Sequence, residues 1–321
     1  MTRNRRAPRK LRLPTLGEVN VYVREMEAVK DVYRETLGFN VPSSADTYPL
    51  PSGLAVSEIL FRVGPVLEFR SVHDREKAMQ QRPRAVDFLQ EHEGALTLVL
   101  NVKSVRATAT ALRRHGFDVS DPQPAPFAVN GKPPFQFLVF RGFFNVAPSA
   151  AMVSEGLPPR VVAFSQVATF MERRFQNRLL SPEFKTWLQH PNTAIGIRSV
   201  WIAVKDLEAA AEAYASIGLP CGATRKARWL RADGREIRVD GGRILLLQPS
   251  DNRGKVASFF PEREEGIIGL SVEVQDLLSA RRLIQRKAKR ILSAFDRPHR
   301  RSVLIPAELA HGVWIEMFQR R

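Results

Sequence analysis

Residues 17–39 read GEVNVYVREMEAVKDVYRETLGF and set a pattern that the rest of the chain repeats. Val19, Val21 and Val23 alternate with polar or aromatic residues, which is the two-residue period of a β-strand. The apolar residues that follow recur at three- and four-residue steps, so they share one face of a helix, and Gly38 stands where that helix should end. The stretch predicts a strand followed by an amphipathic helix.

The same pattern returns three times, in residues 95–117, 197–220 and 266–290. The copies align on the valine that ends each strand, namely Val23, Val102, Val204 and Val274. Gly116 and Gly218 occupy the place of Gly38, where a left-handed helix cap is wanted, whereas the fourth copy has Ala288 there and its helix is expected to continue. Each copy ends in a strongly apolar stretch that predicts a last strand. The unit is therefore a βαβββ module, repeated four times.

Charge is the unusual bulk property of the chain: 49 Lys and Arg against 33 Asp and Glu give a net charge of +16 at pH 7. Basic residues gather in the first twelve positions and again in residues 281–290, on the fourth predicted helix. We interpret the first group as a disordered arm and the second as a solvated helix face. Weak, non-specific association with nucleic acid is the most that this charge predicts.

No stretch approaches eighteen consecutive apolar residues, and no apolar segment follows the basic N-terminus. The sequence therefore predicts neither a membrane span nor a secretory signal, and we expect a cytoplasmic protein. Four modules can pair within one chain, so a monomer or homodimer is expected.

The run VKDLEAAAEAY at 204–214, together with a strand of the form LEF at 67–69, resembles the vicinal-oxygen-chelate superfamily of glyoxalases, bleomycin-resistance proteins and extradiol dioxygenases. The resemblance spans residues 16–318. It implies an α+β fold in which four βαβββ modules pair into two open-barrel, glyoxalase-like domains, each around a ligand cavity. Gln166 and His190-Pro191-Asn192 further resemble a two-domain glyoxalase-like branch, from which Val167 and Thr193 depart.

These observations predict four segments of the chain: a basic disordered arm over 1–14, an N-terminal glyoxalase-like domain over 15–170, a bridging segment over 171–194 and a C-terminal glyoxalase-like domain over 195–321.

The resemblance also implies positions for divalent-metal ligands on the first and last strand of each module. The first-strand positions are Glu18, Thr97, Ser199 and Gly269, and the last-strand positions are Glu68, Gln166 or its neighbour Val167, Leu245 and Glu316. The second half keeps one coordinating group, which argues against the two-histidine, one-carboxylate iron site of an extradiol dioxygenase. A hard ion such as Mg²⁺ or Mn²⁺ could use Glu18, Glu68 and Gln166. Without a metal, two carboxylates in one cavity would form an acid/base pair.

Strand alternation adds further candidates, because Glu18, Asn20 and Tyr22 lie on the face opposite the valines, which should line the cavity. The catalytic candidates are Glu18 and Glu68. The substrate-binding candidates are Gln166, Thr97, Asn20, Tyr22 and His190, and His190 also suits a capping or packing role. The second cavity offers Glu316 and Ser199, with Glu316 expected to pair with Arg198 or Arg243.

Two functions from different classes fit this sequence. The first is an enzyme of the lyase or isomerase type that acts on a small oxygenated, anionic metabolite in the N-terminal cavity, by acid/base chemistry with or without a divalent metal. The second is a non-catalytic protein of the bleomycin-resistance kind that sequesters a small molecule. Carboxylates within apolar strands favour the enzyme, and the lack of histidine at the ligand positions favours sequestration.

Overall fold

The computed structural model describes residues 14–41, 47–117, 182–261, 263–297 and 300–320, with shorter pieces at 119, 121, 123–124, 148–149, 151–153 and 162–165. The expected basic arm, apart from Pro14, lies outside the described residues, as does Gln166.

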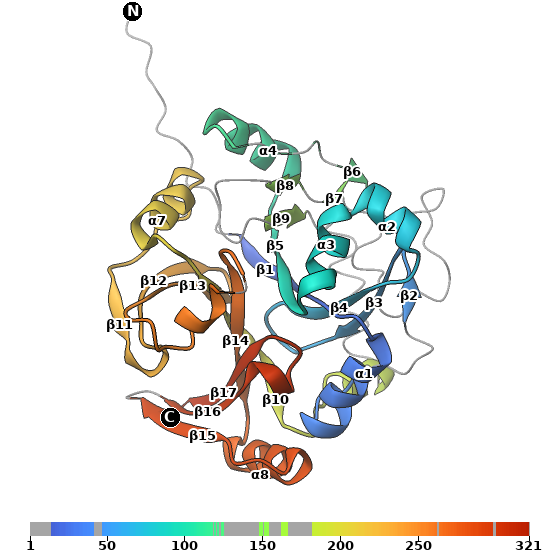
Figure 1. Ribbon diagram of the computed structural model, residues 1–321, viewed down its shortest axis with the longest axis vertical. Helices are drawn as coiled ribbons and strands as arrows, with labels where there is room; N and C mark the ends of the chain where they lie inside the picture. Colours follow the sequence, from blue (N-terminus) through green and yellow to red (C-terminus); the bar gives the residue numbers. More distant parts are fainter. Residues whose placement is uncertain are drawn as a thin grey trace, which may run out of the picture.

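The first sheet has seven strands in the order β2-β3-β4-β1-β5-β9-β8 (Figure 1). Their bounds are β1 Thr15–Tyr22, β2 Tyr48–Pro49, β3 Leu54–Ile59, β4 Val66–Val72, β5 Gly94–Asn101, β8 Ala151–Val153 and β9 Val162–Ser165. β1 runs parallel to β4 and antiparallel to β5, and β5 runs parallel to β9. The first strands of two modules thus meet at the middle of this sheet. A separate two-stranded pair joins β6 (Gln123–Pro124) to β7 (Pro148–Ser149).

The second sheet has eight strands in the order β11-β12-β13-β10-β14-β17-β16-β15. Their bounds are β10 Ala194–Ala203, β11 Arg225–Ala227, β12 Ala232–Val239, β13 Gly242–Pro249, β14 Gly266–Val274, β15 Ser293–Arg297, β16 Arg300–Ile305 and β17 Trp314–Arg320. β10 is parallel to β13 and antiparallel to β14, and β14 is parallel to β17. The same pairings in both sheets confirm the α+β fold of four βαβββ modules in two open barrels.

One helix follows the first strand of each module: α1 (Met26–Asp31), extended by the π-helical turn η1 (Val32–Thr36), then α4 (Val105–Arg114), α7 (Leu207–Ser216) and α8 (Leu277–Ala288). Gly38, Gly116 and Gly218 have φ of 71°, 83° and 84°, which confirms the predicted left-handed caps. The expectation that the fourth helix continues past Ala288 is wrong, because Lys289 itself takes the left-handed conformation with φ of 49°. None of the described helices is long and apolar enough to span a membrane.

One apolar core joins the helix-covered faces of both sheets, with Tyr33 and Ile284 among its fully buried residues. Tyr33 reaches across the halves, and its hydroxyl donates a hydrogen bond to the carbonyl oxygen of Ala310 at 3.1 Å. Burial raises the pKa of Tyr33 above its ordinary value, so the phenol keeps the proton that this bond needs.

The opposite face of each sheet, here called its inner face, is also covered. Over the first sheet lie α2 (Arg75–Gln81) and α3 (Pro83–Glu91), drawn in front of its strands in Figure 1. Ala85, Val86 and Leu89 of α3 pack with Leu54 and Val56 of β3. No pattern within α3 indicates that its apolar face closes over the sheet. Shorter helical turns are η4 (Arg228–Leu230), η5 (Ala257–Phe259), η6 (Ala307–Leu309) and α6 (Pro182–Trp187).

The two halves meet backbone to backbone where Val63 bridges Gly196 in β10. The amide of Arg62 donates to the carbonyl oxygen of Ile195 at 3.0 Å. A Cβ atom on Gly196 would lie 1.9 Å from the carbonyl oxygen of Val63, so this close approach requires glycine.

We predict that Gly196→Ala lowers the free energy of unfolding by about 2 kcal/mol, because the strand must move away from Val63 to admit the methyl group. Gly222→Ala is the matched control, since its Cβ would meet the carbonyl oxygen of Glu236 at an ordinary 3.5 Å. Urea unfolding of both variants measures the difference. Equal, small effects would show that the contact at Val63 does not hold the halves together.

Candidate functional site

A cluster of polar side chains is buried on the inner face of the first sheet. Glu18 and Asn20 come from β1, and Glu68 and Arg70 from β4, each pair two residues apart so that both side chains share a face. The strand register sets Asn20 opposite Glu68. Glu18, Asn20 and Glu68 are 6%, 0% and 3% exposed, so these charges and the amide are removed from bulk water and require polar partners.

Asn20 and Arg70 both connect the two carboxylates. The Asn20 side-chain amide donates to Glu68 Oε1 at 3.1 Å and lies 3.4 Å from Glu18 Oε2. Arg70 Nε donates to Glu68 Oε1 at 2.5 Å, and Arg70 Nη2 lies 3.8 Å from Glu18 Oε2. Glu68 is therefore held by the shorter ion pair. The Oδ1 atom of Asn20 is buried and accepts no hydrogen bond within the described part of the chain.

The guanidinium of Arg70 is the cation of this cluster. Its Nη1 lies 3.3 Å from the hydroxyl of Tyr22, and its central carbon lies 5.9 Å from the Tyr22 ring. Burial lowers the pKa of Arg70, but the charges of Glu68, Tyr22 and Glu18 outweigh burial and leave that pKa above its ordinary value. Nearby, burial and repulsion from Arg70 lower the pKa of Arg82. Arg70 thus carries a permanent positive charge between two carboxylates.

Two further polar residues border the cluster. Glu58 on β3 lies opposite Glu68, and Thr97 on β5 lies opposite Asn20; they are 3% and 5% exposed. This patch of the sheet therefore carries three buried carboxylates, with Arg70 among them and Arg82 close enough to be repelled by Arg70.

The structure brings together most of the residues predicted for the first cavity. Glu18, Asn20, Tyr22 and Glu68 share one network, and Thr97 borders it. Gln166 lies outside the described residues. Arg70 was not among the predicted residues, although its position two residues after Glu68 is a sufficient signal for a shared face. Glu58 could not be found the same way, because its place depends on the β3–β4 register.

His190 lies outside this cluster, where its ring connects the backbone of Asn40 to the backbone of Leu60. The Asn40 amide donates to its Nδ1 at 2.9 Å, so Nε2 carries the proton and donates to the carbonyl oxygen of Leu60 at 3.0 Å. Its ring also contacts Phe39 and Phe61. Burial, partly offset by the bond to Leu60, lowers the pKa of His190 to about 4. The residue is neutral and structural in this position, which fits the capping and packing role rather than substrate binding.

On the corresponding inner face of the second sheet, Glu316 and Ser199 are both held by hydrogen bonds. Glu316 is fully buried and accepts hydrogen bonds from Ser271 at 2.6 Å and Ser302 at 2.7 Å. Ser199 accepts one from Arg243 Nε at 3.0 Å. Ser199 and Ser271 are register partners, so the candidates Ser199 and Glu316 share this face without a direct bond.

The expectation that Glu316 pairs with Arg198 or Arg243 is wrong. Arg198 pairs with Glu273 at 2.5 Å, and Arg243 pairs with Glu236 at 2.9 Å. At the predicted ligand position Gly269, the ring of the buried Trp201 from the neighbouring strand β10 takes the place of a side chain. A Cβ atom on Gly269 would lie 2.6 Å from that ring. Trp201 and its apolar neighbours occupy the space that a second cavity would need.

The donor set of the first cluster does not fit a divalent metal as it stands. Among the described residues, no group of three or more His, Cys, Asp or Glu is arranged to hold a metal ion. The two carboxylates predicted as ligands are already bridged by Arg70 and by the NH₂ group of Asn20, neither of which is a ligand for a cation. An ion between them would have to displace the guanidinium.

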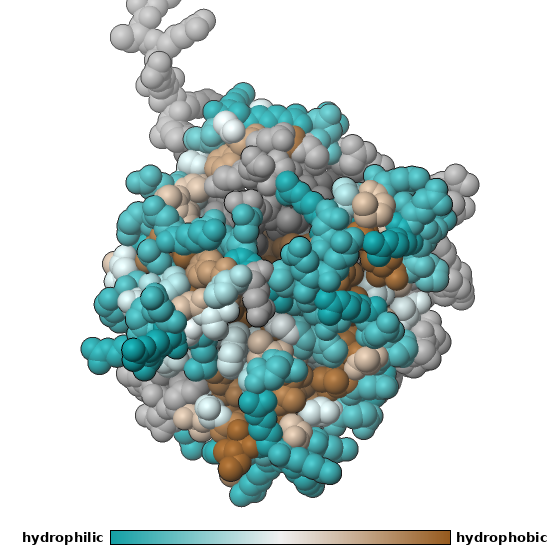
Figure 2. Space-filling view, in the orientation of Figure 1, coloured by the Kyte–Doolittle hydropathy of each residue, from teal (hydrophilic) through white to brown (hydrophobic). Residues whose placement is uncertain are grey.

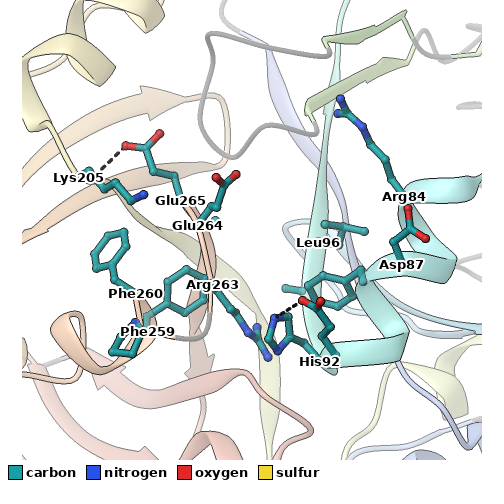
Figure 3. Close-up of a pocket in the computed structure, with 15 residues that line it drawn as sticks. Arg84, Asp87, His92, Leu96, Lys205, Phe259, Phe260, Arg263, Glu264 and Glu265 are labelled. Carbon is teal, nitrogen blue, oxygen red and sulfur yellow. Dashed lines mark hydrogen bonds and ion pairs between the residues drawn. The ribbon is translucent and has the colours of Figure 1, made fainter.

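A separate cleft of about 600 Å³ lies between the halves, with α3 on one side and residues 259–266 on the other (Figure 3). Its apolar wall includes Phe88, Leu96 and Phe260. Glu264 and Glu265 also line it, and Glu265 accepts a hydrogen bond from the backbone amide of Lys205 at 2.7 Å. The volume of this cleft is in the range of small-molecule sites, and the sequence motifs did not predict the cleft.

Arg263 joins the two walls of this cleft. Its guanidinium carbon lies 5.4 Å from the ring centres of both Phe88 and Phe259. It also donates a hydrogen bond to the carbonyl oxygen of Glu93, at the start of the first strand of the second module. Because Arg263 is committed to these contacts, it holds the cleft together rather than offering a free cation to a ligand.

A family model described as a glyoxalase-like domain matches residues 19–218. No curated protein sequence matches the chain. A variant of 4-hydroxymandelate synthase from Streptomyces coelicolor has a similar structure, with a TM-score of 0.66 at 14% identity, covering 96% of this chain and 93% of that one. At that identity the likeness shows the fold alone.

Two smaller solved structures match parts of the chain. Methylmalonyl-CoA epimerase from Mycobacterium tuberculosis is 27% identical over 40% of this chain and 90% of its own, with a TM-score of 0.36. A Streptomyces coelicolor methylmalonyl-CoA epimerase variant in complex with 2-nitronate-propionyl-CoA is 22% identical over 39% of this chain and 96% of its own, with a TM-score of 0.33.

The buried His190 predicts a pH dependence of stability. Its folded-state pKa of about 4 lies below the ordinary 6.5, so the unfolded chain binds a proton first as the pH falls. Stability from this residue is complete above pH 6.5 and is lost toward pH 4, by about 3 kcal/mol in all. Urea unfolding across this window should show a shallower fall in His190→Gln, while the exposed-histidine control His115→Gln should follow the wild type. Parallel curves for all three proteins would contradict the assignment.

Proposed function

This chain belongs to the glyoxalase-like family of the vicinal-oxygen-chelate superfamily, and we propose that it is an enzyme of the lyase or isomerase type. Its substrate is a small oxygenated, anionic metabolite, and its reaction is proton transfer on the inner face of the first sheet. The observation that carries the proposal is the pair of buried carboxylates, Glu18 and Glu68, bridged by Asn20 and Arg70.

Glu18 is the better candidate for the general base. Glu68 is committed to the 2.5 Å ion pair with Arg70, whereas Glu18 lies 3.8 Å from that guanidinium and 3.4 Å from Asn20. A carboxylate that holds the guanidinium at 2.5 Å is poorly placed to take up a substrate proton, so the carboxylate farther from Arg70 is the better choice. We therefore assign proton transfer to Glu18 and the orientation of Arg70 to Glu68.

Arg70 and Asn20 supply the polar groups that an oxygenated anion needs. The side chain of Arg70 is 19% exposed, more than that of either carboxylate, so it is the charged group of the cluster that an incoming anion meets first. Its fixed positive charge would stabilise negative charge that develops on a substrate oxygen when a proton leaves the adjacent carbon. The free Oδ1 of Asn20 can accept a hydrogen bond from a substrate hydroxyl.

The family's divalent metal is not required by this arrangement. Superfamily chemistry stabilises substrate oxygens with a cation, and Arg70 places a positive charge beside the same two carboxylates. Proton transfer and the stabilisation of the substrate oxygen, as assigned above, both depend only on side chains of this protein.

Sequestration without catalysis is the second candidate, and the cleft between the halves is the observation that favours it. The cleft presents Phe88, Phe259 and Phe260 to a ligand, and its acidic residues stand apart from the Glu18 cluster. A binding protein would use that aromatic wall and would not need Glu18.

The test is solvent-deuterium exchange. The protein is incubated in deuterated water with a panel of 2-oxo and 2-hydroxy carboxylic acids. Mass spectrometry measures deuterium at the carbon next to the activating carbonyl or carboxylate group, which is C3 of a 2-oxo acid and C2 of a 2-hydroxy acid. We expect exchange with at least one acid, a loss of about 100-fold or more in Glu18→Gln, and a weakened apparent affinity in Glu68→Gln as Arg70 loses its anchor.

Glu273→Gln is the matched control, because Glu273 forms the same 2.5 Å bond to an arginine Nε in the other sheet, and it should exchange like the wild type. Exchange that survives in Glu18→Gln would contradict the assigned base. Ligands that raise the melting temperature of the wild type without any exchange would support sequestration instead.

A further inference from the structure

The outward face of α8 is densely basic and separate from both sites described above. Leu277, Ala280 and Ile284 turn into the core, so the opposite side of the helix faces solvent. That side and the residues just after it carry Arg282, Arg286, Lys289 and Arg290, and the half-buried Arg281 lies beside them, one turn after Leu277. Figure 2 shows mostly hydrophilic residues along the lower edge of the molecule, where α8 lies in Figure 1.

Much of this charge is not neutralised within the protein. Arg290 pairs with Glu308 at 2.9 Å, and Lys287 lies 3.9 Å from Glu35. Arg281, Arg282, Arg286 and Lys289 form no hydrogen bond or ion pair with side chains of the described residues, although Arg282 is close enough to Asp276 to lower the pKa of that carboxyl. Repulsion among unpaired cations on one helix is unfavourable, so an external anion would stabilise this surface.

A groove of about 530 Å³ runs beside the helix and brings in a further cation. It is bounded by α8 and by β15, β16 and β17, and Arg281 and Arg301 both line it. Within the described part of the chain, the buried Nε atom of Arg281 has no hydrogen-bond acceptor, which is costly for a charged donor. The acidic group lining the groove is Asp276, whose carboxylate caps α8 through Ser279. An anion seated between the two guanidiniums would supply the missing acceptor.

We propose that α8 and the adjoining groove form a docking surface for a nucleic-acid strand, with one phosphate between Arg281 and Arg301 and others along Arg282, Arg286 and Lys289. From residue 278 to 289 the basic surface extends over about 16 Å along the helix axis. This length is greater than the diameter of one phosphate group and allows contact with several successive phosphates of a strand. The recognition is electrostatic and independent of base sequence, because the surface presents cations and no aromatic side chain on which bases could stack.

A lipid bilayer fits this surface less well. Membrane-surface helices keep a continuous apolar face for the acyl chains, but the apolar face of α8 is buried in the core. The exposed apolar residues nearby are Leu278, 53% exposed on the helix, and Ile291, 84% exposed beyond its end. These two isolated side chains do not form an insertion face.

The test compares two double variants of equal net charge. Arg281→Gln/Arg301→Gln removes both groove cations. Arg106→Gln/Arg114→Gln removes two exposed arginines from α4, at the opposite end of the molecule in Figure 1. Binding of a fluorescent single-stranded oligonucleotide is followed by anisotropy over a series of salt concentrations, with full-length protein throughout and circular dichroism to verify folding.

We expect the groove variant to bind about tenfold more weakly at low salt, with a salt dependence reduced by roughly one to two released counterions, while the α4 variant changes less than twofold. Equal weakening of both variants, or unchanged binding in the groove variant, would overturn the proposal and assign any binding to net charge or to the basic N-terminal residues. Binding to anionic vesicles but not to the oligonucleotide would also overturn it.

Discussion

The ion pair of Arg70 with Glu68, extended to Glu18, is the interaction on which the inner face of the first sheet depends. Carboxylates that are 3% and 6% exposed would be strongly unfavourable alone, and removal of one partner from such a buried pair costs about 3–5 kcal/mol. With the guanidinium in place, the charges can remain under the helices α2 and α3, and Asn20 and Tyr22 are held in the same network. The site thus carries its own cation, because Arg70 stands beside the two carboxylates that the sequence predicted as metal ligands.

The two sheets have the same topology, but their inner faces carry different side chains. In the first, the inner face keeps charged groups beside a partly exposed arginine. In the second, Gly269 makes room for the ring of Trp201, and Glu316 is satisfied by two serine hydroxyls, so the face has become part of the apolar packing. We regard the second half as the support. It contributes the Gly196 strand that meets Val63, and Arg263, which closes the cleft between the halves.

The repeat made most of the fold predictable from the sequence, since the strand and helix periods recur four times and the capping glycine three times. Strand alternation was also enough to place Glu18, Asn20 and Tyr22 on one face. The sequence did not show which charged side chains pair with one another. Arg198 and Arg243 were equally plausible partners for Glu316, but in the structure they pair with Glu273 and Glu236. The packing of α3 over the sheet and the burial of His190 depend on contacts between segments far apart in the chain, which no local pattern contains.

Manganese binding tests the central claim, that Arg70 takes the place of a metal ion between Glu18 and Glu68, most directly. Titration of free Mn²⁺ with protein, followed by electron paramagnetic resonance, reports bound metal independently of any substrate. The account predicts no stoichiometric binding by the wild type and a gain of affinity in Arg70→Met, which releases both carboxylates as ligands. One Mn²⁺ bound per wild-type chain and lost in Glu68→Gln would contradict it, because the guanidinium would then not be the cation of the site.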